Sequence, residues 1–235
     1  MRILALDTST EYLSLALLLD GQRHVRALHA GQTHSQHILP LLRELLIEAG
    51  IEMNDLHGIA FGAGPGSFTG LRIGCGVAQG LAFGADLPVV GVSTLLALAH
   101  GEEAQRSNAT RVIACLDARM GEVYHAAYVR DGDSWREVCA PGLYKPEAVP
   151  MVEGAGWTGL GSGWAAYAEA LQTAYGGQTD NISPQAYPHA LAIAELAAPM
   201  FAAGQGVTAA EAAPIYIRNK VALKTSERAA GMKFN

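Results

Sequence analysis

Residues 62–74 read Gly-Ala-Gly-Pro-Gly-Ser-Phe-Thr-Gly-Leu-Arg-Ile-Gly, with five glycines among thirteen residues. The apolar run 56–61 before this block predicts a short strand, and residues 71–85 after it predict a helix. Glycine occurs where the backbone needs a positive φ or must approach another group closely. A glycine-rich turn between a strand and a helix can present amides to an anion, but neither a phosphate-loop Lys-Ser/Thr ending nor the usual dinucleotide context is present. A phosphate contact and a purely structural turn therefore stay as equal alternatives.

The composition predicts a cytoplasmic protein with a large buried core. Half of the 235 residues are hydrophobic and 16% are charged, which suits one large domain or two halves. No apolar run reaches the about 18 residues of a membrane span, and Asp7 follows the first apolar run too closely for a signal peptide. The three cysteines have neither disulfide nor zinc spacing. A net charge of −6 disfavours a free-standing nucleic-acid binder.

An internal repeat predicts two similar halves. Residues 3–7 (ILALD) and 112–117 (VIACLD) are both apolar strands that end in aspartate, and each is followed by another apolar run. The polar stretch 101–110 suggests a boundary, which gives an N-terminal half at 1–103 and a C-terminal half at 104–235. Within the second half we expect a glycine-rich loop at 154–163 and a helix at 186–204. The C-terminal tail is basic, with Arg218, Lys220, Lys224, Arg228 and Lys233.

Two predicted helices have too much apolar or glycine surface for a solvent-exposed helix. Residues 34–49 are apolar on more than one face, whereas a surface helix needs a single stripe. Residues 70–85 carry five glycines within one half of the helical wheel, each costing about 1 kcal/mol relative to alanine. A helix contact inside the domain is the alternative, but together the two helices favour a protein interface. The predicted interface residues are Leu41, Leu42, Leu45, Arg72, Ile73, Gly76, Val77 and Gly80.

Candidate chemistry is sparse, and no pattern predicts a complete active site or a catalytic residue. The acid and hydroxyls of residues 7–10 could hold a magnesium-bound phosphate, although turn capping is favoured for that motif alone. His34 and His37 lie one helical turn apart without a third metal ligand. Asp117, Arg119 and Glu122 are more typical of a hydrogen-bonded hairpin turn than of a catalytic dyad. The residues that remain as candidates for vestigial nucleotide or phosphate contacts are Asp7, Thr8, Ser9, Gly64, Gly66 and Ser67.

Several motifs resemble the bacterial TsaB (YeaZ) family, most densely within residues 1–125. Besides the glycine block 62–74, which is highly specific to this family and its paralogue TsaD, they comprise ILALDTS at 3–9, THS at 33–35, PVVGVSTL at 88–95, LDAR at 116–119 and PIYIR at 214–218. The resemblance implies an α/β fold of the actin/Hsp70/sugar-kinase type, with two RNase H-like halves whose mixed sheets are flanked by helices. It agrees with the internal repeat.

The resemblance also implies a function in tRNA modification. In that family the chain is a non-catalytic activator that works with TsaD and TsaE in transferring a threonylcarbamoyl group to N6 of the adenosine beside the anticodon, in tRNAs that read codons beginning with A. The implied partners are TsaD in a heterodimer, TsaE in a larger complex, a second copy of the chain when it is alone, and tRNA through the complex. Neither a membrane nor a cofactor is implied.

One departure from TsaD concerns metal binding. TsaD has a His-x-x-x-His pair just after the strand that corresponds to residues 88–92, and the matching positions here are Thr94 and Leu98. Neither can replace an imidazole ligand, and His100 is two residues out of phase. The chain thus resembles a non-catalytic paralogue without a metal site. The alternative is an independent nucleotide-binding phosphotransferase or metallopeptidase, although residues 112–163 contain no second recognisable phosphate loop.

Overall fold

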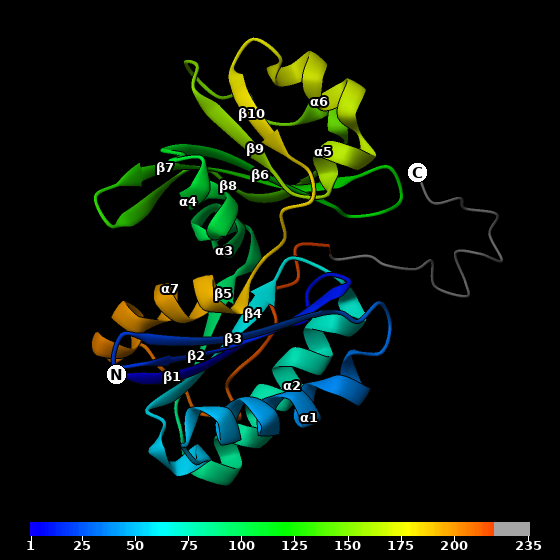
Figure 1. Ribbon diagram of the computed structural model, residues 1–235. Helices are drawn as coiled ribbons and strands as arrows, with labels where there is room; N and C mark the ends of the chain where they lie inside the picture. Colours follow the sequence, from blue (N-terminus) through cyan, green and yellow to red (C-terminus); the bar gives the residue numbers. More distant parts are fainter. Residues whose placement is uncertain (219–235) are drawn as a thin grey trace, which may run out of the picture.

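The computed structural model describes residues 1–218, which form two five-stranded mixed sheets stacked one above the other (Figure 1). The first sheet has the order β3-β2-β1-β4-β5 and consists of β1 (Arg2–Asp7), β2 (Tyr12–Leu19), β3 (Gln22–His29), β4 (Gly58–Gly64) and β5 (Val89–Ser93). The second has the order β10-β9-β6-β7-β8 and consists of β6 (Arg111–Asp117), β7 (Val123–Asp131), β8 (Ser134–Tyr144), β9 (Trp157–Leu160) and β10 (Thr179–Ser183).

The two sheets have the same topology. β1 pairs antiparallel with β2 and parallel with β4, and β6 pairs antiparallel with β7 and parallel with β9. Each sheet thus begins with an antiparallel meander of three strands and continues with two parallel strands. The predicted pair of RNase H-like halves is confirmed, and the two aspartate-ended strands of the repeat are the corresponding central strands.

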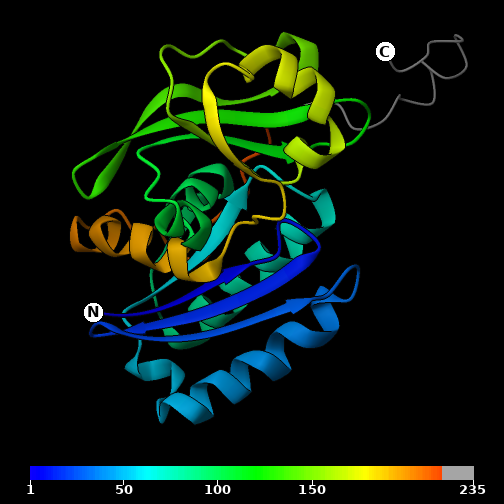
Figure 2. The ribbon, with the colours of Figure 1, turned by 45° about the horizontal axis from the view of Figure 1, so that its top comes forward.

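The helices cover the sheets on defined faces. α1 (His34–Ala49) and α2 (Phe68–Ala85) lie on the outer face of the first sheet, and α7 (Ala190–Ala202) lies on its other face (Figure 2). α3 (Thr94–His100) contacts α7 and also β6 and β7, so it lies between the two sheets. Helix α7 is part of the stretch 104–235 but packs on the first sheet. This stretch therefore does not lie entirely in the second half. In residues 1–218 no helix has the length and apolarity needed to cross a membrane.

The expected loop at 154–163 is wrong, because its middle forms strand β9. All four β9 residues are buried, and β9 lies between β6 and β10. A side chain at Gly159 would overlap with the Trp164 indole, so glycine lets this ring pack directly on the strand. At least one of the glycines that suggested a loop, Gly159, serves packing inside the sheet. The smaller elements of the chain are α4 (Glu102–Arg106), α5 (Gly163–Ala166), α6 (Ala168–Tyr175) and the 3-10 turns η1 (Met53–Asp55) and η2 (Pro146–Ala148).

The predicted bounds of α1 and the predicted end of α2 are confirmed, whereas the start of α2 and both ends of the last helix differ from the prediction. Gly50 ends α1 in the left-handed conformation (φ 66°), and the Ser93 hydroxyl accepts a hydrogen bond from the Leu96 amide at the start of α3. α2 begins at Phe68, three residues before the predicted start, because the Ser67 hydroxyl accepts from the Gly70 amide. The last helix begins at Ala190 instead of residue 186.

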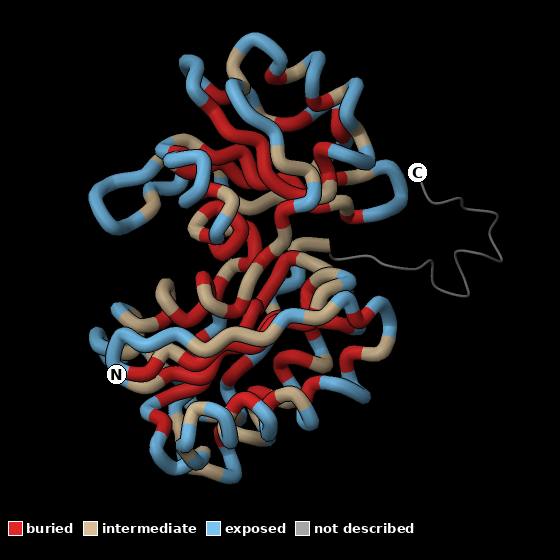
Figure 3. The backbone as a smooth tube through the Cα atoms, viewed as in Figure 1, coloured by how far each residue is buried: buried red, intermediate tan, exposed pale blue. Residues whose placement is uncertain are grey.

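The interior of each half is apolar, and the buried segments follow the sheets (Figure 3). One polar group inside the second half is His125 on β7, which is fully buried. Its Nε2 atom lies 2.9 Å from the Tyr175 hydroxyl, and this hydroxyl donates to the Pro150 carbonyl. Burial lowers the pKa of His125 to about 4, so the imidazole is neutral in the folded protein.

We expect His125 to make the protein sensitive to acid. An unfolded histidine binds a proton below about pH 6.5, whereas folded His125 does so only near pH 4. The unfolded state therefore binds more protons between these values, and stability falls as the pH falls through this window, by at most about 1.4 kcal/mol per pH unit. Urea unfolding at pH 7.5 and 5.0 measures the loss. His125→Gln should show a smaller loss, and equal losses in both proteins would contradict the assignment.

Candidate functional site

A cleft of about 700 Å³ lies between the two halves. The first half contributes the turn after β1 and the start of α2, and the second half contributes the turn after β6 and the region of α5. Its walls carry charged and hydroxyl side chains from both halves, among them Ser9, Glu11, Ser67, Asp117, Arg119, Ser162 and Arg218.

The glycine block lies directly on the turn that follows β1. A side chain at Gly62 would overlap with the Asp7 carboxylate, and one at Gly70 would overlap with the Thr8 carbonyl. The Ser67 amide donates to the Ser9 carbonyl at 2.7 Å. The absence of side chains at these positions therefore serves close packing within the chain, which supports the structural alternative for the block.

The predicted phosphate-contact residues divide into two groups. Ser9, Gly66 and Ser67 line the cleft, whereas Asp7, Thr8 and Gly64 are buried and do not line it. The Thr8 hydroxyl donates to the Gly70 carbonyl at 2.7 Å. The amide and hydroxyl of Ser9 donate to Asp7 Oδ1 at 3.0 and 2.8 Å. The polar groups of residues 7–9 thus hold the turn together, as the capping interpretation predicts.

Asp7 is the most perturbed carboxyl group at this site. Its Oδ2 atom is buried and has no hydrogen-bond partner within residues 1–218. Burial raises the pKa of Asp7 to about 7, and the two bonds from Ser9 oppose this rise only in part. Asp7 lies behind the cleft wall, so the shift arises from packing against the glycine block.

The turn after β6 is a tightly held hairpin, as predicted. Arg119, Met120 and Gly121 all have left-handed backbones, with φ between 57° and 74°. The Arg119 amide donates to Asp117 Oδ1 at 2.8 Å. Arg218 forms an ion pair with Glu122 and also donates to the Arg119 carbonyl at 3.4 Å. Arg218 was predicted only as part of the basic tail, and its contact with this turn was missed because almost a hundred residues separate the two.

The positions that correspond to the TsaD histidines are part of the packing between the halves. Thr94 is fully buried, and its hydroxyl donates to the Pro65 carbonyl at 2.5 Å. Leu98 is buried in the apolar core of the second half. These side chains do not fit a metal ion, and the described chain has no group of three histidines, cysteines or acids placed to hold one. His34 instead lies 3.3 Å from the Tyr12 carbonyl, and His37 is exposed.

A second candidate site is the outer surface of α1 and α2, which we call the α1/α2 face. Leu39, Ile47 and Phe83 expose 53%, 68% and 85% of their surface there. On α2, side chains added at Gly76 or Gly80 would meet no described atom within 4 Å. This face combines exposed apolar side chains with bare backbone, as expected for a surface that another helix can approach closely.

Part of the predicted interface requires correction. Leu42 and Leu45 are only 4% and 0% exposed, because they pack on the first sheet within this chain's own core. Of the glycines assigned to one helix side, Gly70 and Gly74 face Thr8 and not a partner. Sequence reasoning missed Leu39, Ile47 and Phe83. The four-residue spacing of 39, 43 and 47 could have identified an outer stripe, had the inner stripe been recognised first.

Arg72 and Gln79 of α2 hold the C-terminal segment of the described chain. Gln79 donates to the Ala212 carbonyl at 2.9 Å, and Arg72 Nε donates to the Tyr216 hydroxyl at 3.0 Å. The Ile215 amide donates to the Ala63 carbonyl at the end of β4. Residues 207–218 therefore run along the first half and end at the ion pair with Glu122 in the second half. We call this segment the C-terminal strap.

The duplicated sheets with a cleft between them define a two-lobed domain of the actin/Hsp70/sugar-kinase type, and a family model described as TsaD, tRNA N6-adenosine threonylcarbamoyltransferase, matches residues 28–225. Two proteins named tRNA threonylcarbamoyladenosine biosynthesis protein TsaB are similar to this chain over 95% of its length. The protein from Escherichia coli (strain K12) is 44% identical and is covered to 97%, and the protein from Haemophilus influenzae is 42% identical and is covered to 96%. The structure of YeaZ from Pseudomonas aeruginosa matches with a TM-score of 0.82 at 39% identity, over 92% of this chain and 99% of that chain. The chain belongs to the TsaB (YeaZ) family.

We expect Asp7 to give the protein a pH dependence opposite in sign to that of His125. The folded pKa of Asp7, about 7, lies above its unfolded value of 3.8. The folded state then binds more protons between these values, so stability falls as the pH rises from 4 to 7, by at most about 1.4 kcal/mol per pH unit. Asp7→Asn keeps an acceptor for Ser9 and should remove this slope in urea unfolding. An unchanged slope would show that Asp7 is ionised in the fold.

Proposed function

We propose that this chain is a non-catalytic subunit that acts with TsaD and TsaE in transferring the threonylcarbamoyl group to N6 of the adenosine beside the anticodon, in tRNAs that read codons beginning with A. The names of its relatives along nearly the whole chain support the pathway. The observation that carries the subunit role is the α1/α2 face, where the described residues leave the large apolar side chains of Leu39, Ile47 and Phe83 exposed. We place this function in the cytoplasm, where a subunit that modifies tRNA would act.

The chemistry of the interior supports a role without catalysis. At the two positions where TsaD has histidines, Thr94 and Leu98 are buried in packing contacts. The Asp117 carboxylate forms an ion pair with Arg119 at 2.9 Å and accepts a hydrogen bond from the Tyr167 hydroxyl at 3.2 Å. These groups are engaged with one another, and none is arranged as an activated nucleophile with its base. We therefore assign no cofactor and no catalytic residue to this chain.

The α1/α2 face suits the corresponding helices of TsaD. Paralogues share the shape of this surface, and exposed apolar patches are covered by partners. The open backbone at Gly76 and Gly80 admits a close helix, and Phe83 and Ile47 supply apolar area at its edges. Without TsaD, a second copy of the chain can cover the same face in a symmetric dimer. TsaE then joins the assembled complex.

We expect tRNA to bind through the complex, with little affinity for this chain alone. The net charge of −6, from 22 acidic against 16 basic residues, disfavours binding that depends on phosphate neutralisation. Of the basic tail, Arg218 lies within the described residues and is paired with Glu122. The remaining tail cations, Lys220, Lys224, Arg228 and Lys233, lie outside the described residues.

The cleft favours one alternative function, an independent nucleotide-binding phosphotransferase. Ser9, Gly66 and Ser67 line a cavity large enough for a small ligand, opposite Arg119 and Arg218. Calorimetry of the purified chain with ATP separates the two functions. Binding of ATP followed by phosphoryl transfer to an acceptor would favour the enzyme, whereas the subunit role requires neither.

Leucine in place of Gly76 or Gly80 should weaken binding to TsaD. Both positions are open in the isolated fold, so the added bulk leaves folding intact but crowds a partner helix. Overpacking costs about 1–3 kcal/mol per site, which corresponds to roughly 5–150-fold weaker association. Affinity for TsaD is measured beside the melting temperature.

Ala168→Leu is the matched control, because this residue is exposed on α6 of the other half. It should leave TsaD binding unchanged. Folded Gly76→Leu and Gly80→Leu variants that bind TsaD normally and fully stimulate transfer would refute the assignment of the α1/α2 face.

Omitting single subunits tests the non-catalytic role. We expect no threonylcarbamoyl transfer and no peptidase activity from this chain alone, because Thr94 and Leu98 offer no ligand to a metal. Transfer by TsaD and TsaE should fall strongly when this chain is left out. An activity of the isolated chain that chelation abolishes would contradict the proposal.

A further inference from the structure

We propose that residues 219–224 of this chain dock in a groove on the second half. The groove, which we call the α6 groove, has a volume of about 540 Å³ and lies where α6 packs on η2. Many of the side chains that line it are small, which leaves the surface hollow between these elements. Its lining includes Glu147, Tyr167, Glu169, Ala170, Thr173 and Ala174.

The described chain ends beside this groove. Arg218 is the last described residue, and it lines the cleft between the halves. Ala166, at the end of α5, lines both this cleft and the α6 groove. A chain advances by at most about 3.5 Å per residue, so residues 219–224 reach roughly 20 Å beyond Arg218. The segment can therefore enter the groove while the two halves keep their positions.

A series of polar contacts connects Arg218 to the wall of the groove. Arg218 donates to the Arg119 carbonyl at 3.4 Å, and the Arg119 guanidinium forms an ion pair with Asp117 at 2.9 Å. The same carboxyl group accepts a hydrogen bond from the Tyr167 hydroxyl at 3.2 Å, and Tyr167 lines the groove. The point from which residues 219–224 leave the described chain is thus fixed relative to the groove.

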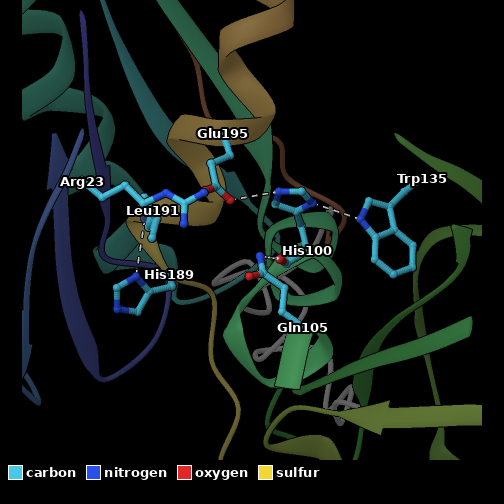
Figure 4. Close-up of polar contacts among 7 residues, drawn as sticks. All are labelled: Arg23, His100, Gln105, Trp135, His189, Leu191 and Glu195. Carbon is cyan, nitrogen blue, oxygen red and sulfur yellow. Dashed lines mark hydrogen bonds and ion pairs between the residues drawn. The ribbon is translucent and has the colours of Figure 1, made fainter. Parts of the chain in front are cut away.

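The α6 groove carries negative charge that the described chain does not neutralise. Glu147 and Glu169 are both exposed. Within residues 1–218, neither carboxylate forms an ion pair, and no lysine or arginine lines the groove. Glu195 of α7 differs, because it contacts both Arg23 and His100 (Figure 4). The groove therefore presents two carboxylates to a basic segment.

The segment that follows Arg218 has the complementary pattern. Residues 219–235 contain four of the 16 basic residues of the chain and only one of its 22 acids. Residues 219–224 read Asn-Lys-Val-Ala-Leu-Lys, so two lysines flank three apolar residues. In the docked state, Val221 and Leu223 bury apolar surface in the hollow, and Lys220 and Lys224 pair with the two carboxylates.

Docking requires little intrinsic affinity, because the segment is tethered to the chain. Exposed ion pairs contribute little to stability on their own, and three apolar side chains bury only a small area. A short tether, however, gives an effective concentration in the millimolar range. A contact with a sub-millimolar Kd is then occupied in most molecules.

The docked segment extends the C-terminal strap over the second half. The strap is bonded to α2 and β4 of the first half and, through Arg218, to Glu122 of the second half. Docking adds a contact with α6 beyond that ion pair. It also places Lys220 and Lys224 in ion pairs within the chain, in line with the weak tRNA affinity expected of this chain alone.

A spin label in the full chain tests the docking by nuclear magnetic resonance. The label is attached at Ser226→Cys, Cys139→Ser removes the half-buried thiol, and Cys75 and Cys115 are buried. A label held near α6 accelerates the relaxation of neighbouring amides, so their signals should lose intensity relative to the same sample with the label reduced. We expect this loss at Ala170, Thr173 and Ala174.

Paired charge reversals identify the two sides of the contact. Glu147→Lys with Glu169→Lys should abolish the intensity loss, and so should Lys220→Glu with Lys224→Glu. Combining all four substitutions should restore the loss, because the ion pairs form again with reversed signs. The spectrum itself shows that each variant is folded.

The matched control is Glu137→Lys with Glu153→Lys, which makes the same charge change at exposed residues of the second half outside the groove and should keep the loss. Full intensity of the α6 signals in the labelled parent protein would overturn the proposal, as would a loss that survives the reversal of Glu147 and Glu169. A loss confined to the α1/α2 face would also overturn it. In a mixture of isotope-labelled and spin-labelled copies, the α6 signals should keep full intensity, and a loss there would replace docking within one chain by docking between copies.

Discussion

The close approach of α2 to the turn after β1 is the contact on which the rest of the site depends. Gly70 and Gly74 must face Thr8, because any side chain there would collide with it. At 100° per residue, this fixes the rotation of α2 and places Gly76 and Gly80 roughly 120° away from that contact, on the exposed surface. The same constraint thus builds the wall of the cleft and exposes a smooth outer surface. Glycine stabilises this arrangement despite its unfavourable helix propensity, because no other residue fits.

The sequence predicts the secondary-structure elements better than it predicts which residues those elements contact. The central strands β1 and β6, helix α1 and the duplicated topology follow from apolar periodicity and the aspartate-ended repeat. The roles of individual glycines do not follow, because a contact such as that of Gly70 with Thr8 joins segments more than sixty residues apart. Strand β9 was missed for a related reason, since Gly159 serves the packing of Trp164. Leu42 and Leu45 were misassigned because helix apolarity alone does not show which side faces the sheet.

The internal repeat places two aspartates at corresponding positions with different environments. Asp7 is fully buried against Gly62, and burial raises its pKa. Asp117 reaches the cleft and holds Arg119 and Tyr167. The difference arises from the segments that cover each strand end: the glycine block covers the first, and the second is left open to the cleft. Duplicated topology therefore supplies one polar group that is enclosed by the fold and one that is accessible to a ligand.

Three sides of α2 make different contacts, and this difference decides which substitutions can distinguish a binding role from a structural one. Gly70 and Gly74 pack inward, Gln79 and Arg72 hold the C-terminal strap, and Gly76 and Gly80 face outward. Arg72 is a predicted interface residue, yet it also bonds Tyr216 and stacks 3.8 Å from the centre of the Phe68 ring. Its loss would loosen the strap as well as any interface, and the strap ends at the ion pair that joins the halves. A substitution on the outward glycines changes the partner surface alone, which is why they and not Arg72 distinguish a binding role from a structural one.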